Sequence, residues 1–108
     1  MIYVVDEITL KPGRLRAFNA AFAKDYLPRA KERGLALIGS WVTPPMEMKG
    51  EGNTVVVLWG IDGLDGFWRQ RKGVSQDPAV KAWWAKVAPS IASRSRRFLE
   101  ATDFSPLQ

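Results

Sequence analysis

The chain has 108 residues and a formal net charge of +5, and it contains neither histidine nor cysteine. Without those side chains it cannot build a Ser-His-Asp or Cys-His nucleophile, a thiolate or imidazole metal site, or a histidine-ligated haem. The 11 carboxylates are scattered and form no Asp-x-Asp-x-Asp-Gly loop, so we expect neither a metal nor a cofactor. The length fits a single domain over residues 1–108, and the lack of cysteine suits a reducing, cytoplasmic compartment.

Two strands and a long helix are predicted in the first 43 residues. Residues 2–10 are β-branched and apolar, which is typical of a strand rather than of a signal peptide, and a Pro-Gly turn ends them. Apolar residues recur at helical spacing from residue 14 to 33, and Pro28 is expected to kink the last turns of this helix. Residues 35–43 form the second predicted strand, which Pro44-Pro45 ends.

The third predicted strand, residues 53–61, carries an unbroken apolar run from Val55 to Trp59. Such a run indicates that both faces of the sheet are covered. One layer of helices covers only one face, so we expect a second copy of the chain to cover the other and form a homodimer.

The last part of the chain is predicted to hold two helices and a strand. The first helix is short, around 64–71, and the second begins at Asp77-Pro78, with a buried stripe that includes Trp83 and Ile91. The final strand is expected over 97–102. The order β-α-β-β-α-α-β matches an α+β, ferredoxin-like domain with a four-stranded antiparallel sheet. No segment approaches the ~20 apolar residues of a membrane span, so we expect none.

The positive charge suggests an anionic partner. The densest basic run is Ser93–Arg97, and no nucleic-acid reader module is recognisable, so we expect no nucleic acid as a partner. Most cations are interpreted as solvated surface, and one or two arginines are expected to bind a carboxylate or phosphate on a small ligand. Five Trp, five Phe and two Tyr are many for so small an interior, which predicts aromatic residues in a pocket or subunit interface.

Several short motifs, in the same order along the chain, resemble the NIPSNAP-type members of the dimeric α/β-barrel superfamily. The resemblance extends from Ile2 to about Phe98. Its most specific parts are Leu10-Lys11-Pro12-Gly13, Gly39-Ser40-Trp41, Leu58-Trp59 after Asn53, Asp77-Pro78 before a Trp-rich helix, and Lys86-Val87-Ala88-Pro89.

The resemblance implies a dimer in which two four-stranded sheets face each other as a barrel with the helices outside. Relatives such as polyketide cyclases, quinone-forming monooxygenases and muconolactone isomerases act in a cleft between each sheet and its own helices. Many of them need neither metal nor organic cofactor, and several rely on a histidine. NIPSNAP-type proteins often carry histidine just before Leu-Trp on the third strand, and here Val57 takes that place.

Asp6 and Tyr26 are the candidate catalytic residues. Asp6 and Glu7 are neighbours on a strand and point to opposite faces, and the same-face neighbours of Asp6 are apolar, so Asp6 is expected in the cleft as a general base. A salt bridge to an arginine is the alternative for this carboxylate. Tyr26 is expected to donate to a ligand carbonyl or enolate, or else to be a core tyrosine whose hydroxyl reaches solvent.

The candidate substrate-binding residues form an aromatic box with a cationic clamp. Core and interface packing is the alternative role for the rings, and solvated surface is the alternative for the arginines. These residues are Phe22, Trp41, Trp59, Trp68 and Trp83 for the box, and Arg69 with Arg71 for the clamp.

The sequence therefore predicts a dimeric protein that binds a small hydrophobic, aromatic or polyketide-like molecule with room for an anionic group. If it is an enzyme, we expect cofactor-free isomerisation, cyclisation or another enolate-type proton transfer, or a monooxygenase-like activity. A non-catalytic binding or interaction protein is the alternative.

Overall fold

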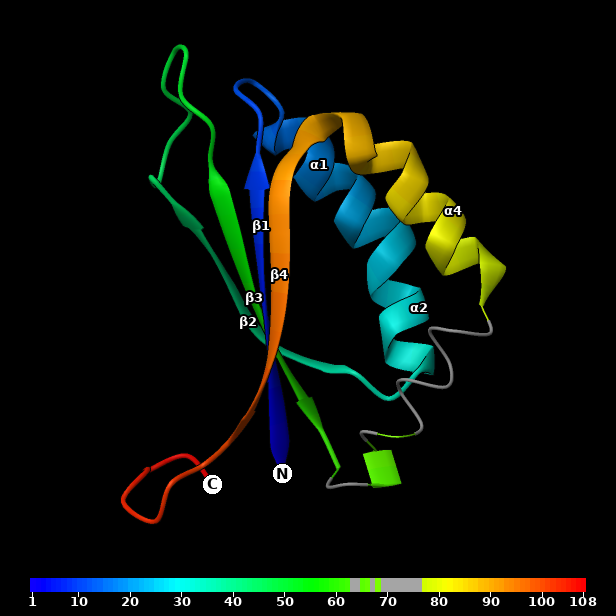
Figure 1. Ribbon diagram of the computed structural model, residues 1–108, viewed down its shortest axis with the longest axis vertical. Coiled ribbons are helices and arrows are strands. Elements are labelled where there is room, and N and C mark those ends of the chain that lie inside the picture. The colour runs from blue at the N-terminus through cyan, green and yellow to red at the C-terminus, as the bar shows by residue number, and fades with distance from the viewer. Residues whose placement is uncertain (63–64, 67, 69–76) are drawn as a thin grey trace.

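The computed structural model describes residues 1–62, 65–66, 68 and 77–108 (Figure 1). Along these residues lie β1 (Ile2–Leu10), α1 (Leu15–Ala21), a π-helical turn (Phe22–Tyr26), α2 (Leu27–Glu32), β2 (Ala36–Thr43), β3 (Thr54–Ile61), α4 (Pro78–Val87), a 3-10 turn (Ala88–Ser90) and β4 (Ile91–Glu100). Most of the short helix predicted around 64–71 lies outside the described residues.

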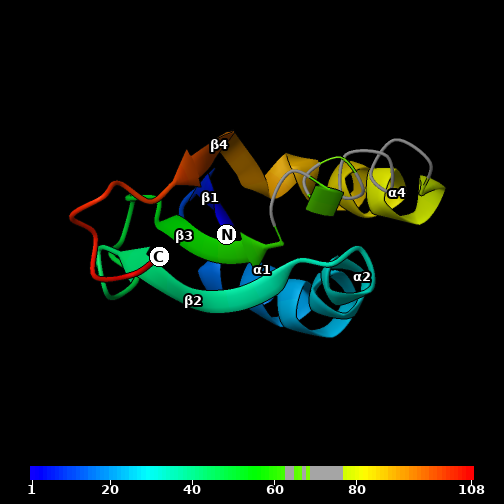
Figure 2. The same ribbon diagram turned by 90° about the horizontal axis from the view of Figure 1, so that it is seen from below.

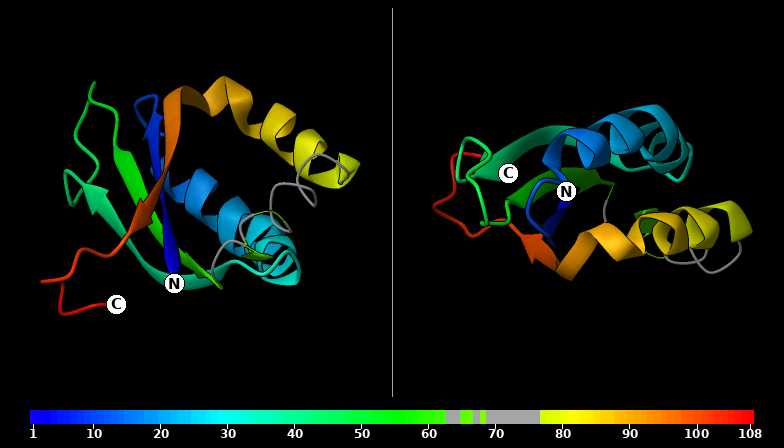
Figure 3. Two further views of the ribbon diagram at one scale, coloured as in Figure 1. Left: turned by 60° about the horizontal axis from the view of Figure 1, so that its bottom comes forward. Right: turned by 90° about the horizontal axis from the view of Figure 1, so that it is seen from above.

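The four strands form one antiparallel sheet in the order β2-β3-β1-β4. Helices α1, α2 and α4 all lie on one side of this sheet, and the C-terminal tail lies toward the other side (Figure 2 and Figure 3). This arrangement confirms the predicted ferredoxin-like α+β class. We call the two sides the covered face and the open face.

The strand register decides which residues occupy each face. On β1, Asp6 pairs with Val57 of β3 and with Arg96 of β4, and all three lie on the covered face with buried Val4 and Ile8. The residues between them point to the open face, because side chains alternate along a strand. The predicted separation of Asp6 from Glu7 is therefore confirmed, with Asp6 under the helices.

The core lies between the covered face and the helices and is rich in aromatic rings. Phe22 lies 6.0 Å from both Trp59 and Trp83, and Tyr26 lies 5.0 Å from Trp83, measured between ring centroids. Phe18 completes the cluster. These rings fill the space between α1, α2, α4 and the sheet. Their observed role is therefore core packing, the alternative to the predicted substrate-binding box.

The long first helix is irregular before Pro28 rather than after it. The N–H of Leu27 donates to the carbonyl oxygen of Phe22, five residues back, and this widens the helix over Phe22–Tyr26. Proline has no N–H for the helical hydrogen bond, and its ring crowds the preceding turn. The irregularity predicted from Pro28 thus takes the form of a π-helical turn that precedes the proline.

Strand β4 begins earlier than predicted. The preceding helix ends at Val87, and Pro89 lies in the 3-10 turn that follows it, so Ile91 starts the strand instead of ending the helix. The basic run Ser93–Arg97 therefore lies entirely in β4, whereas the strand was expected to begin only at Arg97. This correction matters because alternation along the strand points Arg94 and Arg96 toward the helices.

The C-terminal tail covers one end of the open face. There the Tyr3 hydroxyl donates to the carbonyl oxygen of Gln108 at 2.8 Å. Tyr3 is buried as a result, although it points away from the helices.

Candidate functional site

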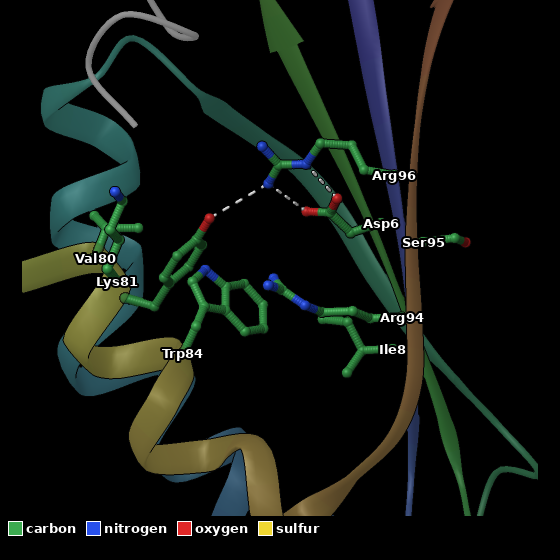
Figure 4. A pocket seen from close by; sticks show the side chains of 9 residues that line it. Asp6, Ile8, Val80, Lys81, Trp84, Arg94, Ser95 and Arg96 are labelled. Atoms are coloured by element: carbon green, nitrogen blue, oxygen red, sulfur yellow. Dashed lines mark hydrogen bonds and ion pairs between the residues drawn. The ribbon is translucent and has the colours of Figure 1, made fainter. Parts of the chain in front are cut away.

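A cleft of about 450 Å³ lies between helix α4 and strands β1 and β4 (Figure 4). Its polar lining consists mainly of charged side chains, and the apolar part includes Ile8 and Val80. The residues that matter for its chemistry are Asp6, Tyr26, Lys81, Trp84, Arg94 and Arg96.

Asp6 is held by three hydrogen bonds. Arg96 donates from Nε to Oδ1 at 2.6 Å and from Nη2 to Oδ2 at 2.9 Å, and Trp59 Nε1 donates to Oδ2 at 2.9 Å. The Asp6 side chain is only 6% exposed. Asp6 therefore forms a salt bridge with an arginine, the alternative expected for this carboxylate. An ionised carboxylate offers about four acceptor positions, so three donors leave one of them open.

Arg96 is a permanent positive charge in the cleft wall. Burial by itself would lower the pKa of its guanidinium, but the hydrogen bonds and charge of Asp6, helped by Tyr26, outweigh burial and raise the pKa above its usual value. A raised pKa keeps the cation protonated at every physiological pH. The bidentate pairing also fixes the plane of the guanidinium.

Two arginines converge on the Tyr26 hydroxyl. Arg33 Nη2 donates to this oxygen at 3.0 Å, and Arg96 Nη2 donates to it at 3.3 Å. Tyr26 is 1% exposed, so its hydroxyl does not reach bulk solvent as the packing alternative supposed. Because the oxygen accepts from both guanidinium groups, its own proton is left to be donated to a third group.

Arg33 is a buried cation with an incomplete set of partners. It is 8% exposed, and within the described part of the chain its Nε and Nη1 atoms have no hydrogen-bond acceptor. Its guanidinium carbon lies 5.4 Å from the centroid of the Tyr26 ring. No carboxylate in the described residues forms a salt bridge with it.

A second cationic group lies in the same wall of the cleft as Arg96, on β4. The Arg94 guanidinium stacks on the Trp84 indole, with its carbon 3.9 Å from the ring centroid. Figure 4 shows Trp84 on α4 and Arg94 reaching toward it from β4. Lys81, also on α4, lines the cleft as well. The described lining thus contains three cations, Lys81, Arg94 and Arg96, against the single carboxylate of Asp6.

The predicted aromatic box is not assembled as expected. Phe22, Trp59 and Trp83 come together, but as buried core rings behind the cleft. Trp41 pairs with Val56 on the open face and is 58% exposed, because its strand register points it away from the helices. Trp68 is also exposed, and Arg69 and Arg71 lie outside the described residues.

The sequence analysis missed five residues that this geometry brings forward. For the two missed residues on β4, the visible signal was the alternation of arginine with serine in Ser93–Arg97, which is typical of a strand and not of a helix. The other three belong to no comparable pattern. The missed residues are Arg33, Lys81, Trp84, Arg94 and Arg96.

Fold and cleft together define a ferredoxin-like α+β domain with a ligand-sized space between its sheet and helices. The chain belongs to the NIPSNAP family, whose model matches residues 3–106. No curated protein sequence matches it significantly. No helix among the described residues is long and apolar enough to cross a membrane.

Several NIPSNAP proteins are among the solved structures with the same fold. An uncharacterised NIPSNAP domain protein from Burkholderia xenovorans is 20% identical, with a TM-score of 0.78 and coverage of 98% of this chain and 99% of that chain. A NIPSNAP family protein of unknown function from Agrobacterium tumefaciens is 22% identical, with a TM-score of 0.77 and coverage of 100% and 94%. A candidate antibiotic biosynthesis monooxygenase from Nitrosomonas europaea is 13% identical, with a TM-score of 0.66 and coverage of 94% and 98%. At these identities the likeness concerns the fold.

Proposed function

We propose that the chain binds a small, flat, largely apolar molecule in the cleft and promotes cofactor-free proton transfer next to a carbonyl group. The observation that carries this proposal is the convergence of the Tyr26 hydroxyl and the Arg96 guanidinium, 3.3 Å apart, beside Asp6. Ile8, Val80 and Trp84 supply apolar surface for the rest of the ligand.

The two donors suit a developing oxyanion. When a proton leaves the carbon next to a carbonyl, negative charge moves to the carbonyl oxygen, and preorganised donors around that oxygen lower the barrier. Tyr26 has a proton to donate, and Arg96 supplies a fixed positive charge. Asp6 is the carboxylate of the described lining, and its open acceptor position would take the proton from carbon and return it to a different carbon.

Binding without catalysis is the competing function, and one specific observation favours it. Both oxygens of Asp6 already accept hydrogen bonds, from Arg96 and Trp59. A carboxylate used only to orient Arg96 would leave the cleft as a binding site without a base.

Hydrogen–deuterium exchange of enolisable aromatic ketones and lactones, followed by proton NMR, separates these functions. We expect exchange with the unaltered protein, a reduction of about 100-fold with Tyr26→Phe, and loss of exchange with Asp6→Asn. The matched controls are Tyr3→Phe and Glu7→Gln on the open face, which should leave the rate unchanged. Binding without exchange would favour the non-catalytic function, and no binding by any compound would contradict both.

We also propose that a second copy of the chain packs on the open face. Trp41 and Leu99 point to this face and are 58% and 42% exposed. Exposed apolar side chains gathered on one sheet face are typical of a surface that is buried in an assembly. In this arrangement each subunit keeps its own cleft on the far side of its sheet.

A further inference from the structure

The cleft contains one arginine that is committed to a carboxylate and one that is not. Arg96 uses its Nε and Nη2 atoms for hydrogen bonds to Asp6 and Tyr26. Arg94, two residues earlier on the same face of β4, forms no salt bridge with any described residue, and neither does Lys81. The cleft therefore has positive charge in excess of what its own carboxylate neutralises.

Stacking on Trp84 prepares Arg94 to bind an acceptor. A guanidinium lying over an aromatic face is held by the electron-rich ring, while its N–H groups point outward in its own plane. That planar fork matches the two oxygens of a carboxylate, and little rotational freedom remains to be lost on binding. Lys81 lies three residues before Trp84 on α4, on the same side of the helix, and adds a second positive charge.

The two polar centres of the cleft differ in what they bind best. Tyr26 and Arg96 present two donors to a single oxygen, as a carbonyl or enolate requires. Arg94 presents a parallel pair of donors next to an indole, which suits a planar carboxylate attached to an aromatic ring.

We infer that the ligand is a small aromatic carboxylic acid, whose carboxylate docks on Arg94 with help from Lys81. The inference rests on the proposed function, because it places the ligand in the same cleft with its carbonyl oxygen toward Tyr26. Arg94 is then the residue that determines specificity for an anionic ligand. It has no part in the proton transfer itself.

A pair of probes that differ only in charge tests this assignment. Calorimetric titration with 2-naphthoate and with 2-naphthamide should show the carboxylate binding at least about tenfold more tightly, the effect of one charge-assisted contact. In Arg94→Gln the two compounds should bind about equally, within about twofold of each other. Arg94→Lys keeps the charge without the planar fork and should show an intermediate preference.

The matched control is Arg97→Gln. Arg97 lies on the same strand as Arg94, three residues later, but points to the open face. This variant should keep the full preference for the carboxylate. Equal binding of both probes by the unaltered protein would overturn the inference, as would a preference that survives in Arg94→Gln. If the carboxylate preference is absent while neutral ketones still exchange deuterium, this inference fails and the proposed function stands. If the protein shows neither a preference for the carboxylate nor deuterium exchange, the inference and the proposed function both fail.

Discussion

Two ion pairs on the same two strands show how differently the faces of this sheet are used. Asp6 pairs with Arg96 under the helices at 2.6 Å, with side chains 6% and 26% exposed. Glu7 pairs with Arg97 on the open face at 3.2 Å, with side chains 45% and 63% exposed. The carboxylates are adjacent in the sequence, and so are the arginines.

The difference lies in burial and in the number of partners. The covered pair is bidentate and receives a further hydrogen bond from Trp59, whereas the open pair is described by one contact. A solvated ion pair contributes little to stability. Removing one member of a buried pair leaves the other charge buried without a partner, which lowers the stability of the fold. Alternation along β1 and β4 thus separates the face of the proposed chemistry from the face of the proposed assembly.

The largest effect that would test this contrast is on stability. Asp6→Ala leaves Arg96 half-sheltered without its counter-charge, and we expect the free energy of unfolding to fall by about 3 kcal/mol. Glu7→Ala is the matched variant and should change it by no more than about 0.5 kcal/mol. Urea unfolding followed by tryptophan fluorescence measures both. Equal effects of the two variants would show that the faces do not differ in this way.

A second expected effect concerns the open face alone. Trp41→Glu places a charge where a second copy is proposed to pack, and we expect the dimer dissociation constant to rise by at least about 100-fold, equivalent to about 2.7 kcal/mol. Sedimentation of the unaltered protein and the variant measures this change. Lys86→Glu, on the exposed side of α4, introduces the same side chain into the helical layer and should leave the dimer intact. An unaltered protein that is monomeric at micromolar concentration would contradict the proposed dimer.

Sequence reasoning went furthest where local rules suffice. The apolar runs, the Pro-Gly turn and the Asp77-Pro78 helix start predicted the order of the described elements and their fold class, and Asp77 indeed caps its helix by accepting from the Ala79 N–H. Alternation from Ile2 to Leu10 placed Asp6 on the apolar side of its strand. That inference needs only the two-residue period of a strand.

The site was harder because its members come from distant segments. Arg96 is 90 residues from Asp6, and Arg33 meets Tyr26 only because the π-helical turn and the end of α2 aim both side chains inward. The faces of β2 could not be assigned from the sequence either, since a register shift between Leu37 and Gly39 decides where Trp41 points. Register and long-range pairing are properties of the assembled sheet.

The smallest expected effect is also the one that separates function from stability. Arg33 is buried with two unpartnered nitrogen atoms in the described structure, which is unfavourable for the fold, yet it holds the Tyr26 hydroxyl at 3.0 Å. Replacing it with an apolar side chain of similar length, Arg33→Met, should therefore raise the free energy of unfolding by about 1 kcal/mol. The same variant should weaken the positioning of Tyr26 and lower the deuterium-exchange rate, a trade of activity for stability that is common at functional sites. Urea unfolding and proton NMR on one preparation measure both quantities. If Arg33→Met is less stable and equally active, Arg33 serves the fold alone. Arg96 would then be the residue that positions the Tyr26 hydroxyl.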